Sequence, residues 1–219
     1  FGGYSSDMSG TKATALSKWC IEKKYNFLRF DYSGHGQSGG KFEDGGITKW
    51  SIEANEVFKK FQNKKNIIIG SSMGGWISLI VTKKNISTVH GLIGIASAPD
   101  FVVGEWNRLS QEQKDEIKRE GKIIINWTDY EEDYVITYKF LKDGMENMLL
   151  KNSIPITCPI RLLHGRLDEV VPISTSQKII DQIQSKDKDL LIIEDGDHSL
   201  SRESDLNLLF NKIEDLVNA

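Results

Sequence analysis

Short apolar runs alternate with longer amphipathic stretches along this chain, and that alternation constrains its fold more than any other feature. The runs predict strands at residues 26–31, 66–70, 89–97, 159–164 and 189–194. Apolar residues recur at helical spacing in residues 9–24, 48–61, 74–83, 173–183 and 206–217. Because strands that alternate with helices are typical of a mostly parallel sheet flanked by helices, the sequence predicts an α/β protein.

Residues 100–152 interrupt this rhythm. They are rich in charge, include a predicted solvated helix at residues 111–120, and carry a cluster of aromatic side chains: Trp106, Trp127, Tyr130, Tyr134, Tyr138 and Phe140. We interpret them as a small helical cap over the carboxyl edge of the sheet, where open α/β folds bind ligands, with residues 1–99 and 153–219 as the core. Trp106, Trp127 and Tyr138 are candidate substrate-binding residues; the alternative is that these rings only pack a small core of the cap.

The start of the chain predicts an incomplete sheet. Phe1 stands where a strand would end, with the body of that strand upstream. A central strand, and an antiparallel pair before it, have no counterpart in the given sequence. We therefore expect a fragment that lacks N-terminal strands.

A G-x-S-x-G motif, Gly70-Ser71-Ser72-Met73-Gly74, lies between an apolar predicted strand and a predicted helix. That is the context in which such a serine sits on a sharp, strained turn, with small neighbours where strand and helix approach. The register makes Ser72 the candidate nucleophile and leaves Ser71 a bystander. Since a serine hydroxyl is a poor nucleophile by itself, the hypothesis requires a base beside it.

The base must be one of four histidines, and position favours His198. It follows the last predicted strand in a polar loop, just before the last helix, as the chain order Ser, acid, His requires. His35 sits in a glycine-rich loop. His90 and His164 lie within predicted strands, where a structural hydrogen bond is the simpler interpretation.

Two aspartates compete for the role of orienting that histidine. Asp168 follows the second-last predicted strand, where a carboxylate would fix the imidazole tautomer and stabilise the imidazolium. Asp100 follows the preceding strand and stays a candidate, because geometry rather than chain position defines the role. We favour Asp168; the adjacent Glu169 would point elsewhere on a tight turn.

Stabilisation of an oxyanion needs two N–H donors. The helix that begins after Ser72 supplies the N–H of Met73. The loop Gly2-Gly3-Tyr4 supplies the other, and Tyr4 N–H is the candidate. The alternative is that these glycines only make a tight turn.

Other patterns and the composition argue against further chemistry. Gly34-His35-Gly36-Gln37-Ser38-Gly39 matches a dinucleotide fingerprint, but no helix opens on it and a tight structural loop is favoured. A formal net charge of −3 gives no reason to expect nucleic acid as a partner. Cys20 and Cys158 are too far apart for a zinc motif, and neither a metal nor a cofactor is expected. No apolar run approaches the ~18 residues of a membrane span. Two cysteines and no visible signal peptide favour the cytosol, or an organelle matrix if a transit peptide was removed.

The motifs resemble those of α/β-hydrolases. The resemblance rests on the segments Asp31–Ser38, Gly70–Trp76, Cys158–Pro172 and Gly196–His198, and the opening Gly2–Ala13 narrows it to the subgroup of mitochondrial palmitoyl-protein thioesterases and acyl-glucuronide esterases with their bacterial relatives. It implies Ser72, Asp168 and His198 as a catalytic triad, with Tyr4 and Met73 at the oxyanion hole.

The expected reaction is hydrolysis of a small-molecule ester or an acylated protein through an acyl-enzyme intermediate. Non-ester chemistry on the same fold, such as C–C hydrolysis or perhydrolysis, and a non-catalytic binding protein are the alternatives.

Overall fold

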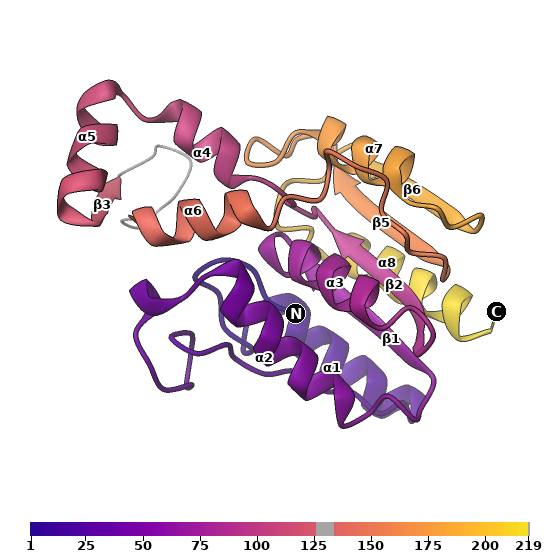
Figure 1. Ribbon diagram of the computed structural model, residues 1–219. Coiled ribbons are helices and arrows are strands. Elements are labelled where there is room, and N and C mark those ends of the chain that lie inside the picture. Colours follow the sequence, from indigo (N-terminus) through magenta and orange to yellow (C-terminus); the bar gives the residue numbers. More distant parts are fainter. Residues whose placement is uncertain (126–133, 219) are drawn as a thin grey trace.

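Four parallel strands form the central sheet of the computed structural model, which describes residues 1–125 and 134–218 (Figure 1). The strand order is β1-β2-β5-β6, with bounds β1 (Asn66–Ser71), β2 (Val89–Ile95), β5 (Ile160–Gly165) and β6 (Lys188–Ile193). Because all four strands run the same way, their carboxyl ends meet at one edge. Nearly every residue of β2 is buried, as its apolar sequence predicts for a strand covered on both faces.

Helices cover both faces of this sheet. One face packs against α1 (Thr11–Lys23) and α8 (Glu203–Val217), and the other against α2 (Ile47–Lys59), α3 (Met73–Lys84) and α7 (Ile173–Gln182). These helices, and four of the five predicted strands, lie within three residues of the predicted bounds. The α/β fold class is therefore confirmed.

The prediction of a strand at residues 26–31 is wrong. Residues 26–31 lie within the described part of the chain but form no strand there. A cavity lined by residues of both lies between this segment and β1. Among the described residues, Phe1 alone pairs with the free edge of β1: its N donates to the carbonyl of Ile69 over 2.6 Å, and its carbonyl accepts from Ser71 N over 3.1 Å. An apolar run becomes a strand only where a neighbouring backbone supplies its hydrogen bonds.

The cap contains more than the predicted helices. It comprises α4 (Val102–Arg108), α5 (Gln111–Glu120), β3 (Lys122–Ile125), β4 (Tyr134–Thr137) and α6 (Tyr138–Glu146). Strands β3 and β4 pair antiparallel, a feature that the sequence analysis missed because each has only four residues. The helix α5 has the predicted bounds, and Ser110 and Gln113 close a capping box at its start.

The cap shares its core with the main domain. Buried side chains of β3, β4 and α6 belong to the same cluster as Trp50 of α2 and Trp76 of α3. In Figure 1 the cap lies beside the edge where the carboxyl ends of the strands meet, and α6 runs back toward α3. The cap thus packs against the main domain near the carboxyl edge, while the boundary at residues 100–152 stays a prediction. Within the described ranges, no helix is long and apolar enough to cross a membrane.

Candidate active site

Ser72 occupies a sharp turn between β1 and α3. Its backbone has φ 54° and ψ −120°, a strained conformation for a residue with a Cβ. Three hydrogen bonds hold it there: Ser72 N donates to Ile95 O over 2.9 Å, and Ser72 O accepts from Ala98 N over 3.0 Å and Gly75 N over 2.9 Å. The neighbouring strand and helix thus impose the strain, which lifts the hydroxyl out of the strand edge.

The glycines of the motif are required by close backbone approach. A Cβ at Gly70 would lie 2.2 Å from the carbonyl oxygen of Gly74. A Cβ at Gly74 would lie 2.2 Å from the carbonyl oxygen of Phe1. The turn can therefore form only with glycine at both positions, as the motif predicts.

Ser72, His198 and Asp168 form a continuous hydrogen-bonded chain. His198 Nε2 lies 3.1 Å from Ser72 Oγ, and His198 Nδ1 lies 2.8 Å from Asp168 Oδ2. The three residues follow β1, β5 and β6, so the shared edge of the parallel sheet brings them together. With Nδ1–H donating to the carboxylate, Nε2 presents its lone pair to the serine hydroxyl, which is the tautomer that a general base needs.

The carboxylate of Asp168 is completely buried and fully hydrogen-bonded. Its Oδ1 accepts from Val170 N over 2.9 Å and Val171 N over 2.8 Å. Burial alone would raise the pKa of this carboxyl, but hydrogen bonds from His164 and His198 outweigh it and lower the pKa well below its ordinary value of 3.8. The group is therefore an anion at neutral pH.

Asp100, the competing acid, has a different task. Its two carboxylate oxygens accept from Leu149 N and Leu150 N, each over 2.8 Å. Burial raises the pKa of this carboxyl. Because Leu149 and Leu150 lie where the chain returns from the cap, Asp100 ties the exit of the cap to its entry.

The loop that carries His198 is clamped from several sides, which sequence reasoning did not foresee. The Lys12 ammonium donates to the carbonyl of Ser199. Arg202 binds both oxygens of the exposed Asp195 and both oxygens of the buried Asp205. The only sequence signal for this clamp was an arginine between two aspartates beside the histidine.

Among the described residues, His198 is the histidine for which a hydrogen bond to Ser72 is found. His35 is buried, and its ring centroid lies 4.9 Å from that of Trp50. The glycine-rich loop around it has positive φ at Gly34 and Gly36 and opens no helix, as predicted. His164 is buried in β5 and makes the expected structural hydrogen bonds.

The two candidate oxyanion donors flank the nucleophile. Met73 is the first residue of α3, so its N–H has no partner within the helix. Across the turn, a Cβ at Gly3 would lie 3.4 Å from Ser72 Cβ, which places the Gly2-Gly3-Tyr4 loop against the serine. The side chain of Tyr4 reaches into the cap, where its hydroxyl donates to Val135 O over 2.7 Å. Its ring packs among aromatic rings of both the core and the cap: Phe42, Trp50, Phe101, Tyr134 and Phe140.

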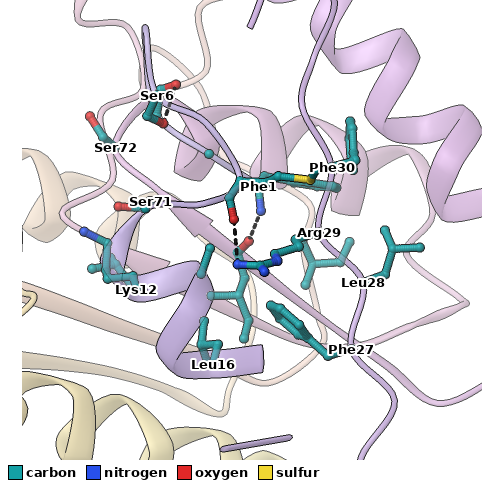
Figure 2. Close-up of a pocket in the computed structure, with 18 of the residues that line it drawn as sticks. Phe1, Ser6, Lys12, Leu16, Phe27, Leu28, Arg29, Phe30, Ser71 and Ser72 are labelled. Carbon is teal, nitrogen blue, oxygen red and sulfur yellow. Dashed lines mark hydrogen bonds between the residues drawn. The ribbon is translucent and has the colours of Figure 1, made fainter. Parts of the chain in front are cut away.

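A cavity of about 1240 Å³ reaches from the nucleophile to the space between residues 26–31 and β1. Figure 2 shows Phe1 in its middle, between Phe30 on one side and Ser71 on the other. Besides Ser72 and His198, its lining includes apolar or aromatic residues after β2, in β4 and in the loop after β5: Ala98, Phe101, Tyr134, Val170 and Val171. Polar residues such as Lys12, Ser199 and Ser201 line it as well.

Two of the predicted substrate-binding aromatics lie elsewhere in the cap. The ring centroids of Trp106 and Tyr138 are 6.1 Å apart, and lysine ammonium groups of α5 and α6 lie over both rings. Neither residue is among the described residues that line the cavity at Ser72. Trp127 lies outside the described residues. A role of these three in substrate binding stays a prediction.

Comparisons with known proteins agree in both sequence and structure. A family model described as serine aminopeptidase, S33, matches residues 6–128 and 133–205. The mitochondrial palmitoyl-protein thioesterase ABHD10 of Mus musculus is 37% identical over 216 residues, which cover 98% of this chain and 73% of that protein. Its solved mouse counterpart, titled α/β hydrolase domain-containing protein 10, matches with a TM-score of 0.90 at 36% identity, covering 100% of this chain and 88% of that one. A putative hydrolase from Agrobacterium vitis S4 matches with a TM-score of 0.92 at 35% identity, covering 98% and 85%.

Proposed function

We propose that Ser72, His198 and Asp168 are the catalytic triad of this chain. The chain belongs to the α/β-hydrolase family described as serine aminopeptidase, S33, and is a serine hydrolase that acts on esters or thioesters. The observation that carries this proposal is the unbroken chain of hydrogen bonds from Ser72 Oγ through the imidazole to the buried carboxylate, at 3.1 and 2.8 Å. Each distance lies within the reach that proton transfer requires.

The geometry supports a two-stage acyl transfer. Ser72 Oγ attacks the carbonyl carbon while His198 Nε2 takes its proton, and the N–H groups of Met73 and Tyr4 stabilise the tetrahedral oxyanion. The intermediate collapses as the imidazolium gives its proton to the departing alcohol or thiol. Water, deprotonated by the same imidazole, then attacks the acyl-serine and releases a carboxylic acid and the free serine.

For the substrate we propose a long-chain acyl thioester on a protein. The relatives at 36–37% identity are named palmitoyl-protein thioesterases, and the cavity at Ser72 has apolar lining residues that an acyl chain could contact. Phe101 and Tyr134 would contact the chain near the reacting carbonyl. Those relatives are named mitochondrial, which favours the organelle matrix over the cytosol for this protein as well.

A serine-reactive fluorophosphonate probe tests the triad. We expect it to label the parent and the Ser71→Ala control equally, and to leave Ser72→Ala unlabelled with an unchanged melting temperature. Equal labelling of Ser72→Ala would refute the nucleophile. Failure of the folded parent to react would favour the binding-protein alternative.

A substrate panel tests the acyl group. We expect kcat/KM for 4-nitrophenyl esters to rise with chain length and a palmitoylated cysteine peptide to be cleaved faster than its acetylated counterpart. Preference for acetyl esters would overturn the long-chain proposal, and turnover of neither ester nor thioester by the labelled enzyme would favour non-ester chemistry.

A further inference from the structure

A second histidine contacts the same carboxylate oxygen of the proposed triad acid that His198 contacts. His164 lies in β5, and its side chain, like that of Asp168, is completely buried. Its Nε2 is 3.2 Å from Asp168 Oδ2 and 2.8 Å from the carbonyl oxygen of Val171. Its Nδ1 is 2.7 Å from the hydroxyl of Ser176, a buried residue of α7.

These contacts define the tautomer of the His164 ring. Two oxygen acceptors, one of them anionic, face Nε2, so the ring proton must sit on that nitrogen. The Ser176 hydroxyl can rotate to donate to Nδ1. With its proton on Nε2, the buried ring has a hydrogen-bond partner at both nitrogens. The partner of Nδ1 is the Ser176 hydroxyl of α7, which holds the ring in place.

Asp168 Oδ2 consequently accepts a hydrogen bond from Nδ1 of His198 and lies 3.2 Å from Nε2 of His164, whose proton is shared with the carbonyl oxygen of Val171. Its Oδ1 accepts from the backbone N–H groups of Val170 and Val171. Rotation of this buried carboxylate would break its three hydrogen bonds and its contact with His164, and each bond left unmade in the interior costs free energy. The direction in which Oδ2 faces His198 thus depends on the donor at His164.

We propose that His164 is a positioning residue of the hydrolysis reaction, whose Nε2–H, shared with the Val171 carbonyl, faces Asp168 and so fixes the oxygen that orients His198. This inference rests on the proposed function, because it requires Asp168 to be the triad acid. The charge state of the acid agrees with it: burial raises the pKa of Asp168, and the hydrogen bond from His164 is the largest contribution that lowers it.

Two substitutions separate positioning from packing. His164→Gln keeps an N–H donor of similar reach, whereas His164→Leu fills the space without one. We expect His164→Leu to lower kcat by roughly 10- to 100-fold with KM within about twofold, as the loss of one charge-assisted hydrogen bond remote from the substrate predicts. His164→Gln should retain kcat within about fivefold of the parent.

A double-mutant cycle decides whether the effect passes through Asp168. Once Asp168→Ala has removed the carboxylate, the further change His164→Leu should cost less than about threefold in the residual kcat, because the two residues act as a unit. If the two losses multiply, or if a folded His164→Gln is as impaired as His164→Leu, the proposal is overturned. Should His164→Leu fail to fold, Ser176→Ala replaces it in the cycle. We expect Ser176→Ala alone to lower kcat with KM unchanged, and to cause no further loss of kcat when combined with Asp168→Ala. Losses that multiply in the double variant would overturn the proposal.

The cycle also distinguishes this inference from the proposed function. Full activity of Asp168→Ala would refute the triad itself, and with it the premise. An inactive Asp168→Ala beside a fully active, folded His164→Leu would leave the triad standing and refute the role of His164 alone.

Discussion

Replacing Asp168 by Asn changes charge and hydrogen-bond polarity while it keeps the shape of the side chain. The amide oxygen would keep the bonds from Val170 N and Val171 N. The amide nitrogen would then take the place of Oδ2 and present N–H groups to two imidazole donors. His198 can accept from the amide only through an unprotonated Nδ1, which moves its proton to Nε2. Ser72 then faces a donor instead of a base.

The size of the effect follows from this change of tautomer. In triad hydrolases, the corresponding change lowers kcat by about 10⁴-fold, or roughly 5.5 kcal/mol of transition-state stabilisation. Because the Asp168 side chain is completely buried, it cannot touch the substrate, and KM should stay within about threefold. The charge-assisted bonds to Oδ2 are lost, so we expect the free energy of unfolding to fall by about 1–3 kcal/mol.

Steady-state kinetics on a 4-nitrophenyl ester, with thermal unfolding measured in parallel, would check these values. Glu169→Gln is the matched control: it removes a negative charge from the exposed neighbour and should leave kcat unchanged. Asp100→Asn tests the competing acid and should keep kcat within about tenfold, while it weakens one of two hydrogen bonds at the exit of the cap. If Asp168→Asn kept most of its kcat and Asp100→Asn lost it, the assignment of the acid would be wrong.

Three further predictions concern the stability of the site. Arg202→Met leaves the buried carboxylate of Asp205 without its cation and should lower the melting temperature of the protein. The control Arg166→Met breaks only a solvent-exposed ion pair and should lower it clearly less. Equal shifts would argue against the clamp. The pKa of Asp168 lies below its ordinary value of 3.8, so the stability that its carboxylate contributes is complete above that pH and is lost as the pH falls through the folded-state pKa. Below about pH 4, the melting temperature of the parent should therefore decline more steeply than that of Asp168→Asn. Parallel curves would contradict this prediction. Gly70→Ala would place a Cβ 2.2 Å from the carbonyl of Gly74 and should lower the free energy of unfolding by about 3 kcal/mol or more, so a denaturant midpoint equal to that of the parent would refute the close approach.

The sequence by itself determined the α/β class and the strand–turn–helix around Ser72, and it singled out His198 as the candidate base. Each of these is encoded locally. The period of apolar residues distinguishes strand from helix, glycines permit one tight turn, and a polar loop after the last strand marks the histidine. Such signals need no knowledge of what lies across the sheet.

The structure decided what depends on partners distant in the chain. Residues 26–31 have the composition of a strand but no ladder beside them, and the short pair β3 and β4 exists because each strand supplies the hydrogen bonds of the other. Chain position favoured Asp168 but left Asp100 as a competitor, and only the fold shows that an imidazole meets the carboxylate of Asp168 while backbone N–H groups meet that of Asp100. The second imidazole at Asp168 was equally hidden, because hydrogen bonding depends on direction and distance between atoms, which spacing along a chain does not encode.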